Sequence, residues 1–176
     1  YNPGGMFKIS NDIMDNPGDA KYGMTTEQLF DAFKKQMKYF IDIKIKGSNV
    51  IEKIYAEYMP VPFLSIITND CISKGRDYNG GGARYNTKSL QGVGIGTITD
   101  CLSAVKYHVY DKKTFTMEEL MQALDDNFEG HDRIANLVRN KTPKYGNDDD
   151  YADDIMRSVF EYYRSQVTGR PNMLGG

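Results

Sequence analysis

The feature that most constrains the fold is an apolar stripe running through residues 25–58. Thr25 and Gln28 have the spacing of a capping box at its start, and Pro60 and Pro62 follow its end. Between these signals, apolar side chains recur at the three- and four-residue steps of one helix face: Leu29, Phe30, Phe33, Met37, Phe40, Ile41, Ile45, Val50, Ile51, Ile54 and Tyr58. The stripe therefore predicts one long helix, which must bury this face against other parts of the protein.

The rest of the chain also reads mainly as helix, while residues 1–24 read as a loop or extended arm. Start and stop signals predict further helices from Pro62 to Gly75, from Thr97 through Val109, from Thr116 to Gly130, around Ile134–Val138, and from the acidic run Asp148–Asp150 to Gly169.

A glycine-rich segment at residues 76–96 interrupts the helices. Its glycines indicate unusual backbone conformations or close backbone packing. We predict short strands at residues 84–86 and 90–95. The phosphate-loop ending Gly-Lys-Ser/Thr is missing, and the glycines have the wrong spacing for a dinucleotide fingerprint, so nucleotide binding is disfavoured.

Composition excludes several classes of protein. The 176 residues suffice for about one domain, and their 40% hydrophobic content can build a core. The net charge is -2 with both signs mixed, which gives no electrostatic reason to expect nucleic acid or an anionic membrane as a partner. No apolar run approaches the roughly 20 residues of a membrane span.

Local chemistry identifies no nucleophile and no metal site. Cys71 and Cys101 are not in a Cys-x-x-Cys pair and have no neighbouring base, so we predict buried, unreactive thiols, although a bridge between them stays open. His108 is predicted to be a half-buried structural residue and His131 a surface residue at a helix start. Asp148–Asp150 is predicted to cap a helix rather than to bind a metal.

Longer blocks resemble the pyruvate formate-lyase-like domain of glycyl radical enzymes. The resemblance covers nearly the whole chain, and its main blocks are Asp70–Asn79, Gly81–Asn86, Gln91–Gly96, Thr99–Ala104, Phe115–Leu120, Asn127–Gly130, Pro143–Tyr151, Gly169–Asn172 and Gly175–Gly176. Within the family, Tyr58–Ser65, Asp77–Asn79 and Lys141–Tyr151 are most similar to the dehydratase and eliminase branch, in particular its trans-4-hydroxy-L-proline dehydratase subfamily.

The resemblance implies an α/β fold, in which this chain is a mostly helical segment of a ten-stranded α/β barrel. It implies radical elimination of water from a small-molecule substrate in anaerobic metabolism. The glycyl radical of such enzymes is installed by a separate radical S-adenosylmethionine activating enzyme, and no cofactor is expected to bind this segment itself. A cytoplasmic homodimer with no nucleic-acid or membrane partner is the corresponding expectation.

The family's catalytic motifs are missing from the sequence. The thiyl cysteine of the family lies in Gly-Cys-x-Glu and the radical glycine in Arg-Val-x-Gly-Tyr, and neither stretch occurs here. We therefore predict no catalytic residue, and we expect residues 1–176 to be an interior part of the domain. The N-terminal half, the thiyl-cysteine loop and the C-terminal glycyl radical domain would lie outside it, and the chain alone would be inactive.

By the resemblance, Val93 and Ile95 border the substrate cavity, and ordinary core packing is the alternative for both. Three alternatives to a hydroxyproline dehydratase stay open. One is pyruvate formate-lyase (formate C-acetyltransferase). Another is a related eliminase such as glycerol dehydratase or choline trimethylamine-lyase. The third is a non-catalytic scaffold module.

Overall fold

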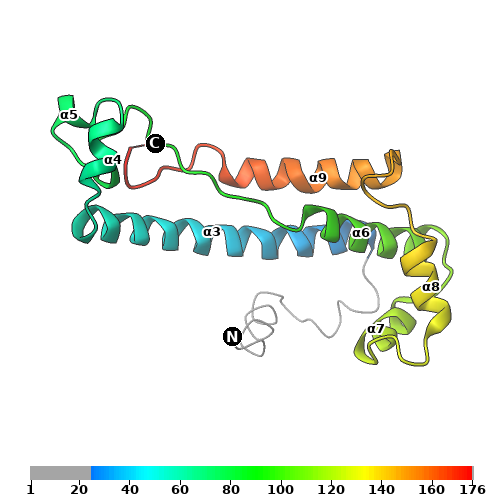
Figure 1. The fold of residues 1–176 in the computed structure, drawn as a ribbon. Helices are drawn as coiled ribbons and strands as arrows, with labels where there is room; N and C mark the ends of the chain where they lie inside the picture. The colour runs from blue at the N-terminus through cyan, green and yellow to red at the C-terminus, as the bar shows by residue number, and fades with distance from the viewer. Residues whose placement is uncertain (1–24, 176) are drawn as a thin grey trace. The chain divides into compact units, whose positions relative to one another are not determined.

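The computed structural model describes residues 25–175 (Figure 1). In chain order its elements are α3 (Thr26–Tyr58), α4 (Pro62–Ile67), α5 (Cys71–Lys74), the 3-10 turn η1 (Tyr78–Gly80), α6 (Ile95–Val105), the π-helical stretch η2 (Lys106–Asp111), α7 (Met117–Asp125), α8 (Asp132–Asn140) and α9 (Asp150–Val167). The prediction for residues 1–24 lies outside the described residues.

Helix α3 confirms the long-helix prediction. The Thr25 amide donates to Gln28 Oε1 at 2.8 Å, and the Gln28 amide donates to Thr25 Oγ1 at 3.3 Å, so the capping box is formed. The helix ends at Tyr58, before Pro60. Pro62 takes a first-turn position in α4, and Gly75, with φ 57°, caps α5. The single helix predicted from Pro62 to Gly75 is wrong, because the extended Thr68 and Asp70, at φ 77°, divide it into α4 and α5.

The predicted strands at residues 84–86 and 90–95 are wrong, because residues 25–175 contain no strand. Ile95 is the first residue of α6, which begins after Gly94 at φ 85°. A strand needs neighbouring backbone to pair with. Here a side chain supplies a partner instead: Asn172 Nδ2 donates to the Asn86 carbonyl.

Helix α7 is shorter than predicted. It begins with the expected capping box between Thr116 and Glu119 but ends at Asp125 rather than near Gly130. Asn127 and Phe128 take positive φ angles of 51° and 64°, which a right-handed helix cannot contain.

The chain divides into two compact units. Among the described residues, the first unit comprises 25–37 and 92–164, and the second comprises 38–91 and 165–175. Two apolar clusters lie in the first unit. One is built on Phe115, Leu120, Ala123 and Ile134, and the other on Leu102, Ile155 and Val159.

The second unit buries fewer apolar side chains, namely Ile41, Ile45, Cys71 and Ala83. No described helix is long and apolar enough to cross a membrane.

Candidate functional site

The glycine-rich segment is tied to the turn before α4 through one carboxylate. Asp77 Oδ2 accepts from the Val61 amide at 2.9 Å and from Ser65 Oγ at 2.7 Å, and Oδ1 accepts from the Asn79 amide at 2.9 Å. Burial acts to raise the pKa of Asp77, but these hydrogen bonds hold the pKa below its ordinary value. Asp77 is therefore an ionised anchor for the segment.

Close backbone packing explains two of the glycines. Gly81 has φ 84°, which disfavours side chains. A Cβ on Gly82 would lie 2.1 Å from the carbonyl oxygen of Arg76, so only glycine fits there. The prediction of close backbone packing is confirmed at this turn.

An arginine–aspartate pair and a lysine fix the next residues. Arg84 binds Asp70 through two hydrogen bonds of 2.9 and 3.1 Å, and Lys74 Nζ donates to the Ala83 carbonyl at 2.8 Å. The hydrogen bond from Arg84 holds the pKa of Asp70 below its ordinary value.

The two predicted cavity-wall residues lie at the other end of the segment. Val93 is 90% exposed in this chain, and Ile95 is half-buried at the start of α6. A Cβ on Gly92 would lie 3.2 Å from Ile95 Cδ1, so Ile95 covers that glycine. Their contact with a substrate cavity stays a prediction.

A buried carboxylate on α3 was missed by the sequence reasoning. Glu52 is 3% exposed, and its Oε1 lies 2.8 Å from Lys88 Nζ. Its Oε2 accepts from the Met173 amide at 3.1 Å. The sequence signal was weak, because Glu52 adjoins the apolar Ile51 on a helix whose other charged residues are exposed or half-buried.

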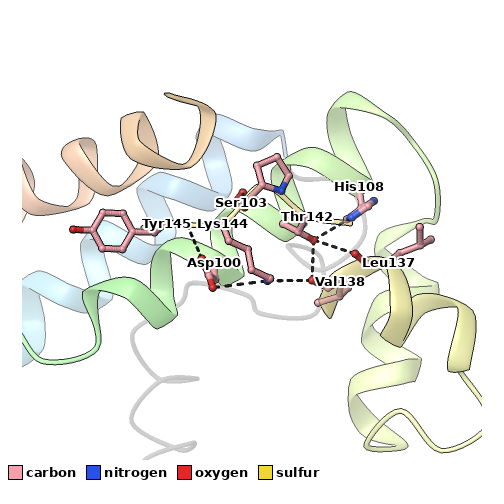
Figure 2. Close-up of polar contacts among 9 residues, drawn as sticks. Asp100, Ser103, His108, Leu137, Val138, Thr142, Lys144 and Tyr145 are labelled. Atoms are coloured by element: carbon pink, nitrogen blue, oxygen red, sulfur yellow. Dashed lines mark hydrogen bonds and ion pairs between the residues drawn. The ribbon is translucent and has the colours of Figure 1, made fainter. Parts of the chain in front are cut away.

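In the first unit, a polar network fixes the connection between α8 and α9 (Figure 2). Ser103 Oγ donates to the Pro143 carbonyl at 2.6 Å, and Asp100 Oδ1 accepts from the Tyr145 amide at 3.0 Å. Lys144 Nζ lies 3.8 Å from Asp100 Oδ2 and donates to the Val138 carbonyl at 3.3 Å. These contacts fix the backbone at Pro143, Lys144 and Tyr145, and each of them joins two residues of this chain.

His108 belongs to the same network and is more buried than predicted, at 1% exposed. Thr142 Oγ1 lies 2.9 Å from the Val138 carbonyl, which can only accept, so this hydroxyl donates there. His108 Nε2, 3.1 Å from Thr142 Oγ1, must then carry the proton, and Nδ1 accepts from Thr114 Oγ1 at 2.9 Å. Burial lowers the pKa of His108, in agreement with this neutral tautomer. A neutral imidazole with both nitrogens engaged is structural, as predicted.

A cavity of about 610 Å³ in the first unit is lined by charged and aromatic residues, including Glu27, Lys34, Lys106 and Tyr151. Tyr151 donates to Asp111 Oδ2 at 2.8 Å, and Lys106 Nζ lies 2.7 Å from the same oxygen. Burial and the hydrogen bond to Asp111 raise the pKa of Tyr151, so the phenol stays protonated. Tyr151, Lys106 and Asp111 thus pair with one another, and the hydrogen bonds to Asp111 hold the pKa of its carboxyl below the ordinary value.

The two cysteines differ in burial. Cys71 is buried, as predicted, but Cys101 is exposed, so that prediction is wrong. Thr99, Leu102 and Ser103 occupy the buried face of α6, which leaves Cys101 on its outer face. The two thiols are free rather than bridged. Among residues 25–175, no three His, Cys, Asp or Glu side chains gather closely enough to hold a metal.

The remaining candidates behave as predicted. His131 is the partly exposed N-cap residue of α8, with Nε2 2.9 Å from Asp126 Oδ2. At the start of α9, Asp149 Oδ1 accepts from the Tyr151 amide at 3.0 Å, which confirms a capping role for the acidic run.

Known proteins match this chain along nearly its whole length. A family model described as pyruvate formate lyase-like matches residues 2–176. Trans-4-hydroxy-L-proline dehydratase from Clostridioides difficile is 62% identical over 159 residues, which is 90% of this chain and 20% of that protein. (2S)-3-sulfopropanediol dehydratase from Klebsiella oxytoca is 36% identical over 151 residues, or 85% of this chain and 18% of that protein.

Solved structures agree. The glycerol-bound B12-independent glycerol dehydratase from Clostridium butyricum matches with a TM-score of 0.81 and 36% identity, over 89% of this chain and 20% of that one. A glycyl radical enzyme from Archaeoglobus fulgidus matches with a TM-score of 0.78 and 36% identity, over 86% of this chain and 19% of that one. The chain thus spans about a fifth of the length of the relatives it matches.

Proposed function

This chain belongs to the pyruvate formate lyase-like family, and from that membership we propose that it is an interior part of a glycyl radical dehydratase acting on trans-4-hydroxy-L-proline. The proposed substrate is supported by the sequence identity of 62% to a trans-4-hydroxy-L-proline dehydratase, compared with 36% to a dehydratase named for a sulfonated diol. The same contrast argues against the other eliminases of the family.

In this proposal the chain supplies scaffold for a ten-stranded α/β barrel completed by the rest of the protein. The radical glycine and the thiyl cysteine lie in that remainder. A separate radical S-adenosylmethionine enzyme installs the radical, and the enzyme works as a cytoplasmic homodimer. The closed barrel keeps water and oxygen from the radical.

Val93 and Ile95 are proposed as part of the substrate-cavity wall. The exposure of Val93 supports this, because its apolar side chain is uncovered by the described chain and available to face a cavity formed elsewhere. Val93→Phe in the full-length enzyme should raise the KM for substrate. Unchanged kinetics in a stably folded variant would contradict a place in the wall.

The test of the function uses the full-length protein, produced anaerobically with its activating enzyme. Electron paramagnetic resonance should show one radical species, and trans-4-hydroxy-L-proline should be dehydrated with a kcat/KM at least tenfold above glycerol, choline or a sulfonated diol.

Other results identify the alternatives. Formate release from pyruvate and coenzyme A would identify a pyruvate formate-lyase. Failure to form any radical with a competent activating enzyme would identify a non-catalytic scaffold module.

A further inference from the structure

Glu52 is an unusual residue for its position on α3. The helix carries most of its charged side chains at the surface, and the adjoining Lys53 is exposed, yet Glu52 is 3% exposed. Glutamate is seldom fully buried unless it is paired. Two non-helical segments reach this carboxylate, one through Lys88 and one through the amide of Met173.

The two partners use different oxygens. Lys88 Nζ lies 2.8 Å from Oε1, and the Met173 amide donates to Oε2 at 3.1 Å. One side chain therefore links the glycine-rich segment and the segment after α9 to the same helix. An aliphatic residue of similar size would fill the space but would leave the Met173 amide without its acceptor.

The two segments also bind each other next to this carboxylate. Asn172 Nδ2 donates to the Asn86 carbonyl at 2.5 Å. A Cβ on Gly81 would lie 3.3 Å from the Leu174 carbonyl oxygen, which shows how closely the segments approach. We call Glu52, Lys88, Asn86, Asn172 and Met173 the Glu52 latch.

The latch lies just before the proposed cavity wall in the chain. Lys88 precedes Val93 by only five residues, and Gly92 and Gly94 make the backbone around Val93 conformationally permissive. Where the backbone is permissive, a contact at a neighbouring residue is needed to hold a side chain such as Val93 in one position. We propose that Glu52 is a positioning residue, which fixes the glycine-rich segment through Lys88 and so sets the place of Val93 in the substrate cavity. This inference rests on the proposed function.

Burial makes the two sides of the ion pair unequal. The Lys88 side chain is 48% exposed, so without Glu52 it can turn to water. The Glu52 side chain is 3% exposed, so without Lys88 a buried charge loses its counter-ion. Lys88→Met should therefore lower the Tm more than Glu52→Gln does, and the double variant should recover part of the loss of Lys88→Met.

The experiment uses the full-length radical enzyme with Glu52→Gln, Lys88→Met, the double variant and the control Lys53→Met. Measurements are the Tm, the KM and kcat per radical spin, and hydrogen exchange of the peptide that covers residues 86–95. A purely structural loss lowers the amount of active enzyme and leaves the KM unchanged. A displaced wall raises the KM for trans-4-hydroxy-L-proline, and it also lowers the rate, since a misplacement near 1 Å can cost up to about a hundredfold.

Four results support the inference together. Lys88→Met and the double variant both raise the KM, although the double variant regains Tm, because neither can hold residue 88 on the helix. Exchange at residues 86–95 is faster in both, and Lys53→Met matches the wild type. If the double variant regained both the Tm and the KM of the wild type, the positioning role would be overturned.

Failure of the proposed function gives a different pattern. If the wild type forms its radical but does not dehydrate hydroxyproline, the proposed substrate is wrong. Hydrogen exchange then still tests whether the Glu52 latch fixes the glycine-rich segment. Faster exchange at residues 86–95 in Lys88→Met then supports the fixed point, and exchange equal to the wild type overturns it.

Discussion

The two units of the chain bury their apolar side chains to different degrees. The first unit has two apolar clusters, built around Phe115 and Ile155. The second unit leaves large apolar side chains exposed on α3, α4 and α5 and in the segments beside them: Ile43, Val50, Ile51, Ile54, Tyr55, Tyr58, Met59, Phe63, Leu64, Ile66, Ile67, Ile72 and Tyr85. Surfaces of this kind are typical of interaction sites.

Polar contacts organise the second unit instead. Asp77, Glu52 and the Asp70–Arg84 pair each join segments that lie apart in the sequence. Such contacts contribute little net stability, but an unpaired buried partner is costly, so they specify one arrangement of the backbone. The difference teaches that the first unit contains its own core, whereas the second leaves an apolar face that the described residues do not cover. Under the proposed function, the rest of the full-length protein would bury this face.

The largest effect is expected in the core of the first unit. Phe115→Ala removes a 3% exposed ring and should lower the free energy of unfolding of that unit by about 3–5 kcal/mol. Hydrogen exchange of the α7 and α8 amides measures this. Leu124→Ala, on the exposed face of α7, is the matched control and should cost below about 1 kcal/mol. Equal effects of the two substitutions would show that no core has formed there.

A substitution on the exposed face of α4 should affect stability differently in the isolated chain and in the full-length protein. Ile66 is 64% exposed in this chain, so Ile66→Ser should leave the stability of the isolated chain nearly unchanged. In the full-length protein the same substitution should cost about 2 kcal/mol, since burying a large aliphatic side chain contributes roughly that much. Denaturation of both forms checks the difference. A small effect in both forms would mean that the face stays exposed to solvent in the full-length protein.

Local signals predicted the helices well. Both capping boxes and the proline after Tyr58 act within a few residues, and the structure has each of them. The end of α7 was missed because Asn127 and Phe128 adopt left-handed conformations. Such conformations are uncommon for residues other than glycine, so the sequence carried no signal of them.

Long-range contacts account for the other misses. The strands were predicted inside the glycine-rich segment, but there the carbonyls of Ala83 and Asn86 accept from the side chains of Lys74 and Asn172. The Glu52 latch joins residues separated by 121 positions, which no periodicity can reveal. Val93 and Ile95 came from family resemblance alone, and their role stays a prediction.

The pH dependence of the first unit should carry the signature of His108. Burial lowers the pKa of this imidazole below its ordinary value of 6.5 in the unfolded chain. Between those two pKa values the unfolded state binds a proton that the folded state does not, so stability is lost as the pH falls below about 6.5. The slope reaches at most about 1.4 kcal/mol per pH unit.

His108→Gln removes the titrating group and should flatten this slope. Urea denaturation of wild type and variant between pH 7.5 and 5, a range set around the ordinary histidine pKa, checks it. Identical slopes in the two proteins would mean that another group titrates in this window, or that His108 is protonated when folded.

The smallest effect tests whether the start of α7 needs its cap, even beside a well-packed core. Thr116 Oγ1 accepts from the Glu119 amide at 3.1 Å, and Glu119 Oε2 accepts from the Thr116 amide at 2.7 Å. Thr116→Ala removes one of these hydrogen bonds and should cost about 1 kcal/mol, while Thr116→Ser keeps the hydroxyl and should leave the stability nearly unchanged. Hydrogen exchange in the first turn of α7 distinguishes them. If Thr116→Ala were as stable as Thr116→Ser, packing on Phe115 and Leu120 would suffice to fix the helix start, and the contrast between a packed first unit and a polar-anchored second unit would be sharper still.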